Sequence, residues 1–364
     1  MALWDRAASE LTKMGYTHFI VTPGASFTYL TGWETHLSER LTLFGMRSDG
    51  KAALLVPKLE ASGVSSHQNI KIFNYSDETG PTQALQAFVS ELDLTAESRV
   101  GIESMQLRVF EANFLLQQGV KHLLAADELP MSLRLIKDDQ EIAHLQSAAE
   151  IVDAALTAAL PLFRFGMTEL DVAAELEYQM RKLGSQGTPF ATIVGSGPRG
   201  ALPHGGPTTK RITAGELVVL DYGARFAGYA ADTTRTLAFG EPSDTARRVY
   251  EIVRTAQQAA IDGVTAGMTA AQVDRLAREV IERAGYGEYF THRTGHGLGL
   301  DVHEYPSIME GNELALTAGM VFTIEPGIYL PGEFGVRIED DVVVTAKGAL
   351  VLTRFTKELM VVGN

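Results

Sequence analysis

Apolar and polar positions follow two different periods along this chain. In its C-terminal part a helix is predicted to begin near Asp138, which forms a capping box with Glu141 three residues later. The apolar positions that follow recur at intervals of three and four and predict one buried helix face: Ile142, Leu145, Ala149, Val152 and Leu156. A long helix therefore opens this part of the chain.

The N-terminal part mixes short helical and strand patterns. Ser9–Met14 has a helical pattern, and three apolar runs bounded by turn residues predict strands: His18–Thr22, Ala52–Val56 and Val100–Glu103. We interpret this part as an independent α/β domain. The boundary is expected within Asp127–Lys137, which gives an N-terminal domain at 1–130 and a second domain at 131–364.

The second domain repeats its own pattern. The run 213–223 recurs 104 residues later as 317–327, and each copy presents a carboxylate at the same place, Asp221 and Glu325. Upstream of each copy, the repeated Gly-Met-Thr triplet ends in a candidate helix N-cap, and a glycine stands where a C-cap glycine belongs. These four residues are Thr168, Thr269, Gly184 and Gly285. The order of helices, strands and hairpin, given twice, predicts a closed, internally duplicated α+β domain with both hairpins meeting inside.

Composition and charge narrow the function. The 364 residues are 45% hydrophobic and 21% charged, as in an ordinary soluble protein. The net charge of −14 argues against nucleic acid, whose binding depends on basic surface. Because there are no cysteines, any metal must be held by oxygen and imidazole. No apolar run reaches membrane-spanning length and the N-terminus does not resemble a signal peptide, so the expected location is the cytoplasm.

Four carboxylates are predicted to share one pocket. If the first hairpin pairs about residues 226–227, Asp221 and Asp232 lie opposite each other on one face. Glu325 and Glu339 flank a second turn near residues 330–333 and are expected to oppose each other too. Four such charges repel strongly, so the pocket needs cations.

His296 is the candidate imidazole ligand of this pocket, because its flanking glycines let the backbone approach closely. A single aspartate in a hairpin is usually a turn or surface residue, and a single histidine in a glycine-rich loop is usually structural. Two acid pairs, one histidine and a repeat in register rarely occur together by chance. Together they predict two divalent cations about 3.5–4 Å apart, as in two-metal hydrolases.

These motifs resemble the pita-bread metallopeptidases, a group that contains methionine aminopeptidase, Xaa-Pro aminopeptidase and Xaa-Pro dipeptidase (prolidase). The likeness covers nearly the whole chain and is strongest from Phe190 to Asp340. The N-terminal segment Tyr29–Gly32 resembles the extra, creatinase-like domain of the proline-directed members. Methionine aminopeptidases generally lack that domain, so the resemblance implies the proline-directed branch. The matching segments are 190–194, 201–205, Asp221 with Asp232, 292–297 and 337–339.

The resemblance also implies residue roles. Asp221 and Asp232 would hold one metal, and Asp232, His296, Glu325 and Glu339 the other, with Asp232 and Glu339 bridging. Glu325 would double as general base for a water that bridges the metals.

Four further residues would contact the substrate. His204 and His303 would contact its carbonyl and the developing oxyanion, and His292 and Arg337 would line its proline and carboxylate side. Two of these roles have plainer alternatives: His204 could be a structural loop residue, and Arg337 could hold Glu339 by an ion pair. The oxygen-rich ligand set favours Mn²⁺, with cobalt and zinc as alternatives.

Three functions stay open. A prolidase-type dipeptidase is favoured over a Xaa-Pro aminopeptidase by the compact second hairpin, with 14 residues between Glu325 and Glu339. A non-peptidase binding module on the same fold is the third, although no ligand position is missing. The expected substrate is a peptide with proline at its second position. The expected assembly is a homodimer, in which the stretch 34–47 is a candidate to reach the partner's site.

Overall fold

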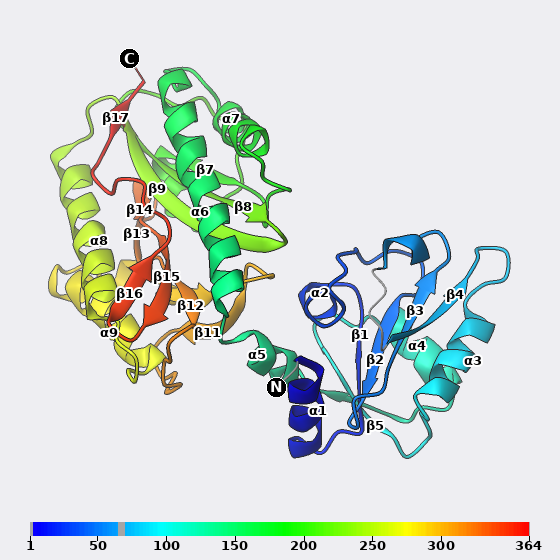
Figure 1. Ribbon diagram of the computed structural model, residues 1–364. Helices are drawn as coiled ribbons and strands as arrows, with labels where there is room; N and C mark the ends of the chain where they lie inside the picture. The colour runs from blue at the N-terminus through cyan, green and yellow to red at the C-terminus, as the bar shows by residue number, and fades with distance from the viewer. Residues whose placement is uncertain (1–2, 65–69, 364) are drawn as a thin grey trace. The chain divides into compact units, whose positions relative to one another are not determined.

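The computed structural model describes residues 3–64 and 70–363. The chain divides into two compact units, Met1–Arg134 and Leu135–Asn364 (Figure 1). The boundary drawn from sequence, after residue 130, falls inside helix α5 (Glu128–Arg134). Because Leu129 and Leu133 of that helix pack into the core of the first unit, this unit extends to the helix end.

The first unit is a six-stranded mixed sheet with helices on both faces. The strand order is β4-β3-β2-β1-β5-β6, and β1 pairs in parallel with β5 and antiparallel with β2. The strands are β1 (His18–Val21), β2 (Leu43–Arg47), β3 (Ala52–Pro57), β4 (Ile70–Tyr75), β5 (Arg99–Ile102) and β6 (His122–Ala125). The other helices are α1 (Leu3–Lys13), α2 (Ala25–Thr31), α3 (Thr82–Glu91) and α4 (Val109–Gln117).

Alternation along the strands builds the two cores of this unit. Phe19 of β1 packs into the cluster beneath α1 and α5, whereas Ile20 packs into the cluster beneath α3 and α4. The stretch 34–47, expected to reach a partner, is in part wrongly assigned. Its second half is strand β2 in the middle of the sheet, with Leu43, Phe44 and Met46 fully buried.

The second unit contains the predicted duplication. Helices α6 (Asp139–Ala159) and α7 (Glu169–Lys182) precede the hairpin of β8 (Glu216–Phe226) and β9 (Tyr229–Phe239). Helices α8 (Asp244–Gly263) and α9 (Ala270–Arg283) precede the second set of strands. Thr168 and Thr269 each cap their helix within a capping box, and Gly184 and Gly285 follow the helix ends with φ of 105° and 82°. The α+β class and the internal repeat are confirmed.

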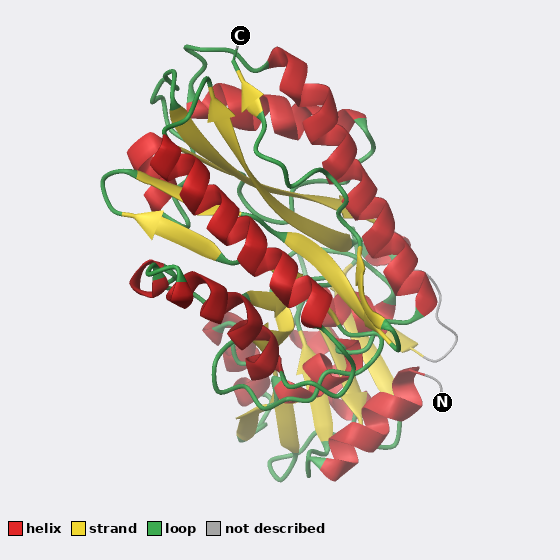
Figure 2. Ribbon diagram, turned by 90° about the vertical axis from the view of Figure 1, so that its left-hand side faces the viewer, coloured by secondary structure: helices red, strands yellow, loops and turns green. Residues whose placement is uncertain are grey.

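Three sheets meet in this unit. Their strand orders are β17-β9-β8-β7, β11-β10-β12-β15-β16 and β13-β14. The remaining strands are β7 (Ile193–Ser196), β10 (Gly295–Gly297), β11 (Glu304–Ile308), β12 (Val321–Ile324), β13 (Gly327–Leu330), β14 (Phe334–Arg337), β15 (Asp340–Thr345), β16 (Gly348–Val351) and β17 (Val361–Val362). Helix α6 packs along β8 and β9. Figure 2 shows the long helices of this unit flanking these strands.

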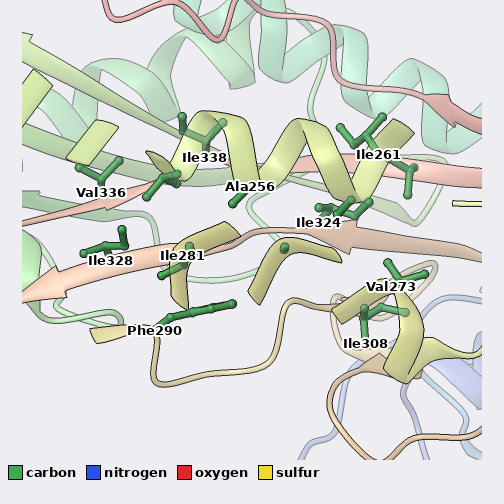
Figure 3. Close-up of a cluster of buried hydrophobic side chains, with 14 of the residues drawn as sticks. Ala256, Ile261, Val273, Ile281, Phe290, Ile308, Ile324, Ile328, Val336 and Ile338 are labelled. Atoms are coloured by element: carbon green, nitrogen blue, oxygen red, sulfur yellow. The ribbon is translucent and has the colours of Figure 1, made fainter. Parts of the chain in front are cut away.

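A continuous apolar core supports the second half of the repeat. Side chains from α8, α9 and the strands around them interlock in Figure 3, among them Ala256, Val273 and Ile324. Ile324 and Ile338 of this core each adjoin a predicted carboxylate ligand in sequence, so packing fixes the backbone beside Glu325 and Glu339. In the described part of the chain, no helix combines the length and apolarity that a membrane crossing requires.

Candidate metal centre

The first hairpin turns one residue later than the sequence suggested. Ala227 and Gly228 form its two-residue turn, with φ of 49° and 82°, so the predicted pairing about residues 226–227 is wrong. A positive φ is uncommon for alanine, which is why residue types offered only a weak signal for this position.

The corrected register keeps both carboxylates together. Asp221 lies opposite Thr234, and Asp232 lies opposite Gly223. Because this register differs from the expected one by an even number of positions, Asp221 and Asp232 become diagonal neighbours on the same face. Both side chains are buried, with 9% and 5% exposure of the residues.

The second pair lies in an interruption between two short pairings. Ile324 pairs with Asp340 on one side, and Gly327 pairs with Arg337 on the other. The register is the same on both sides, so Glu325 and Glu339 face each other across the gap. The turn that follows lies between β13 and β14, where the sequence predicted it.

His296 enters the same space from β10. The glycines on either side of it are required, because a Cβ on Gly295 would lie 1.8 Å from the Thr323 carbonyl oxygen and one on Gly297 2.0 Å from that of Tyr305. The Nε2 atom of His296 lies 3.3 Å from Glu325 Oε1 and 3.7 Å from Asp232 Oδ2.

Three of the five predicted ligands form a compact group. Asp232, His296 and Glu339 each offer an atom, and these atoms all lie within 4.8 Å of one another. Glu325 joins them through His296, and Asp221 adjoins Asp232. One buried oxygen on each of Asp221, Asp232 and Glu339 has no hydrogen-bond partner among the described residues. Unsatisfied buried carboxylate oxygens beside an imidazole suit divalent cations.

The pKa shifts in this group also favour the binding of cations. Burial and the neighbouring carboxylates raise the pKa of Asp232 and of Glu339 well above the usual range. Burial also raises the pKa of Glu325 to about 7 and lowers that of His296 to about 3. The imidazole is therefore neutral, as a metal ligand must be, and bound cations would restore the charged form of the carboxylates.

Several supporting residues were missed from sequence. The hydroxyl of Thr234 donates to Glu339 Oε2 at 2.6 Å, and Asp341 Oδ2 accepts from the Asp232 backbone N–H at 3.0 Å. Arg235 is buried and donates to Asp340 Oδ1 at 2.7 Å. All of them lie within three residues of a predicted ligand in sequence, which was the available signal. They orient the ligands and hold the two hairpins together.

The guanidinium of Arg337 is hydrogen-bonded to other side chains of the protein. Its Nη2 donates to Asp221 Oδ2 at 2.5 Å, and its Nη1 donates to Tyr329 Oη at 2.8 Å. Its Nε donates to the same Thr234 hydroxyl that binds Glu339, at 3.0 Å. The direct ion pair is therefore with Asp221, and the link to Glu339 passes through Thr234. These contacts favour a role in orienting ligands over one in binding substrate.

The five predicted ligands line a cavity of about 640 Å³, a size suited to a small ligand. His204 and His303 line it and stay open to solvent, as substrate-contacting side chains must. His292 is half-buried and bonds Tyr329 Oη through Nε2 at 2.8 Å. The cavity also has lining residues that the sequence did not single out as contacts: Phe190, Ala191, Ile193, Arg293 and Val302.

The raised pKa values of the buried carboxyls predict how the stability of the metal-free protein depends on pH. At pH 7 and above, which lies beyond the usual histidine pKa of 6.5, the buried histidines are mostly neutral in both the folded and the unfolded state and contribute little further change. Carboxyls with raised pKa still bind protons there in the folded protein but not in the unfolded one. The free energy of unfolding therefore falls as pH rises through about 7, the raised pKa of Glu325.

Calorimetry on chelated and metal-refilled protein tests this expectation. Because cations bind the deprotonated carboxylates, we expect the difference in melting temperature between the two forms to widen over the same pH range. A difference that stays constant would contradict the proposed protonation of the metal-free group.

In the comparison with known proteins, each unit matches a different family model. Residues 143–346 match the model of metallopeptidase family M24, and residues 4–136 match that of the creatinase/prolidase N-terminal domain. An Xaa-Pro dipeptidase from Lactobacillus delbrueckii subsp. lactis is 38% identical over 363 residues, 98% of each chain.

Solved structures agree with this. A dipeptidase from Pyrococcus horikoshii OT3 superposes with a TM-score of 0.94 at 38% identity, over 99% of this chain and 100% of that one. An X-Pro aminopeptidase from Thermotoga maritima MSB8 has a TM-score of 0.85 at 33% identity, over 99% of each chain. The resemblance predicted from the motifs, and the fold class that it implied, are confirmed.

Proposed function

This chain belongs to metallopeptidase family M24, with a creatinase/prolidase N-terminal domain, and we propose that it is an Xaa-Pro dipeptidase that uses two divalent cations. The observation that carries the proposal is the buried group of Asp232, His296 and Glu339 in the wall of a cavity of about 640 Å³. Relatives named Xaa-Pro dipeptidase across almost the whole chain support the substrate class.

The five predicted ligands divide between two cations. Asp221 would hold one, His296 and Glu325 would hold the other, and Asp232 and Glu339 would be shared between them. Cations held there would lower the pKa of water toward neutrality and polarise the scissile carbonyl. The predominance of oxygen ligands favours manganese.

Glu325 is the residue placed to move the proton. Of the two carboxylates beside the His296 ring it is the nearer, at 3.3 Å against 3.7 Å for Asp232, and its side chain retains 15% exposure. It takes a proton from the attacking water as the oxygen–carbon bond forms. It then delivers that proton to the proline nitrogen as the carbon–nitrogen bond breaks, because a secondary amine leaves poorly without one.

Two histidines face the developing oxyanion. His303 and His204 line the cavity with solvent access, and each can donate a hydrogen bond to the carbonyl oxygen as it gains charge. His292, which is hydrogen-bonded to Tyr329, lines the same cavity, and the proline ring would pack against it.

Arg293 is the side chain we assign to the carboxylate of a dipeptide. It lines the cavity, and within the described residues its guanidinium makes one hydrogen bond, from Nη1 to Ser307 Oγ at 3.2 Å. Arg337, the residue implied by the family resemblance, is instead occupied by Asp221, Tyr329 and Thr234. An arginine with donors to spare suits a free carboxylate better.

The deciding assay uses chelated protein refilled with Mn²⁺ and three substrates: Ala-Pro, Ala-Pro amide and Ala-Pro-Ala. We expect cleavage of Ala-Pro to be preferred. In Arg293→Met, KM for Ala-Pro should rise about 10- to 100-fold, the scale of one lost charged hydrogen bond, while KM for the amide stays unchanged. Arg275→Met, which alters an arginine with 56% exposure on α9, is the matched control.

The other outcomes select the other functions. Preference for Ala-Pro-Ala would favour an Xaa-Pro aminopeptidase, an alternative supported by the likeness to the Thermotoga maritima enzyme. No cleavage of any of the three, together with a metal content near zero, would favour a binding module on the same fold.

A further inference from the structure

A buried ion pair joins the first residues of the second unit to the loop that carries His303. Lys137 Nζ lies 3.1 Å from Glu304 Oε2, and the two side chains are 1% and 4% exposed. Lys137 comes three residues after the end of the first unit, and Glu304 comes directly after His303. Neither is among the described residues that line the cavity, so the proposed catalytic steps leave the pair unused.

The Glu304 carboxylate also closes the loop on itself. Residues 298–303 connect β10 to β11, and Glu304 Oε1 accepts the backbone N–H of Asp301 at 3.0 Å. Gly299 N–H donates to the Asp301 carbonyl at 2.9 Å. A Cβ on Gly299 would lie 2.8 Å from Glu304 Oε2, so this glycine makes room for the carboxylate. One carboxylate thus binds the loop with one oxygen and Lys137 with the other.

Lys137 is itself fixed to the strand that leads to Glu325. Its backbone N–H donates to the Gly319 carbonyl at 2.8 Å, two residues before β12 begins. Gly319 has a φ of 90°, and a Cβ there would lie 3.0 Å from the Lys137 carbonyl oxygen. Lys137 therefore ties the His303 loop and the Glu325 strand to one point.

His303 depends on this backbone for its place. Its ring meets the His296 ring edge to face, with centroids 4.4 Å apart, and makes no hydrogen bond within the described residues. The position of the imidazole is therefore set by where the loop holds its Cα and by that single ring contact.

We propose that Lys137 and Glu304 are positioning residues that hold the His303 imidazole in place at the cavity. The proposal rests on the function above only for what His303 does to the substrate. A buried pair of this kind is costly to break on one side, because the remaining group loses its opposite charge, whereas removing both charges lowers that cost. Stability and positioning can therefore be separated by mutation.

The test uses full-length, Mn²⁺-loaded protein. We expect Lys137→Met to lower kcat for Ala-Pro at least about tenfold, with little change in KM, because a displaced imidazole donates poorly to the oxyanion. In a His303→Ala background the same substitution should cost less than about twofold in kcat. An equal loss of kcat in both backgrounds would overturn the proposal, because Lys137 would then act through something other than His303.

The double variant Lys137→Met/Glu304→Gln separates placement from folding. It removes both charges of this pair, and the amide oxygen of the new glutamine can still accept the Asp301 N–H. We expect its melting temperature to return toward that of the parent protein while kcat stays low, because the tie between Lys137 and the loop is missing. Recovery of kcat together with the melting temperature would mean that the pair only stabilises the fold, and the proposal would fail. This variant also carries the test if Lys137→Met does not fold.

A readout that needs no turnover distinguishes this proposal from the proposed function. The ring proton signals of the histidines can be followed by NMR in protein refilled with diamagnetic Zn²⁺, with the His303 signal assigned by its loss in His303→Ala. We expect the His303 signal to shift in both Lys137 variants while metal content stays at the parent value. In the control Lys210→Met, which breaks the 2.8 Å pair with Glu216, it should stay unchanged. An inactive parent protein would reject the peptidase assignment, and this shift would still decide the placement of His303.

Discussion

Glu339→Gln should abolish Xaa-Pro hydrolysis and, at the same time, raise the melting temperature of the metal-free protein. Glu339 is 1% exposed, and burial next to Glu325 and Asp221 raises its pKa well above the usual range. Without a cation, Glu339 must bind a proton when it is buried, which costs free energy at neutral pH, whereas a glutamine is neutral in both the folded and the unfolded chain. The glutamine keeps an acceptor for the Thr234 hydroxyl, so the packing of the two hairpins is preserved.

The two effects have different sizes. Loss of a shared metal ligand should lower kcat/KM on the order of a thousandfold or more, the scale of losing one preorganised electrostatic contact. The free energy of unfolding of the metal-free form should rise by about 1–2 kcal/mol, or roughly 2–6 °C in melting temperature. Activity assays measure kcat/KM, metal analysis measures the cations bound per chain, and calorimetry of the chelated proteins measures the change in stability.

Two comparisons make the experiment decisive. His296→Ala should lose activity equally, but without a gain in metal-free stability, because burial lowers its pKa to about 3 and the neutral ring carries no charge to remove. Retained turnover in either variant would reject the metal assignment. A fall in metal-free stability in Glu339→Gln would show that the carboxylates do not repel each other in the folded protein.

The architecture of the second unit was readable because the same signals occur twice. Thr168 and Thr269 stand at matching places in the repeat and both cap helices in the structure. Asp221 and Glu325 follow matching apolar runs in the repeat, so the chain itself indicated that they belong to one site. Internal duplication gives each local inference a second, independent copy.

The details that escaped prediction depend on the backbone and on partners far away in sequence. The hairpin turn at Ala227 needs a positive φ that alanine rarely adopts, so the register could not be read from residue types. Whether Arg337 faces substrate or ligand depends on Tyr329 and Asp221, which reach it only in the folded chain. The homodimer, the cytoplasmic location and the choice of manganese stay predictions.

Glu325→Gln should separate proton transfer from metal binding at the same site. Burial raises the pKa of Glu325 to about 7 in the absence of metal, so this carboxyl exchanges a proton readily near neutral pH. Glutamine has the same shape and can still offer an oxygen to a cation, but it cannot accept the proton of the attacking water. We expect kcat for Ala-Pro to fall by about 10²- to 10⁴-fold, the usual contribution of a general base.

Metal content decides how such a loss is interpreted. If Glu325 moves the proton, Glu325→Gln should keep two cations per chain, and KM for Ala-Pro should change little. Glu325→Asp should retain part of the activity, because a carboxylate remains within reach of the water. Loss of one cation together with activity would instead make Glu325 a ligand without a role in proton transfer, and the proton at the proline nitrogen would then have to come from another donor. The neighbouring histidines, His303 and His204, are the cavity-lining residues that could supply it, and their alanine variants would test that route.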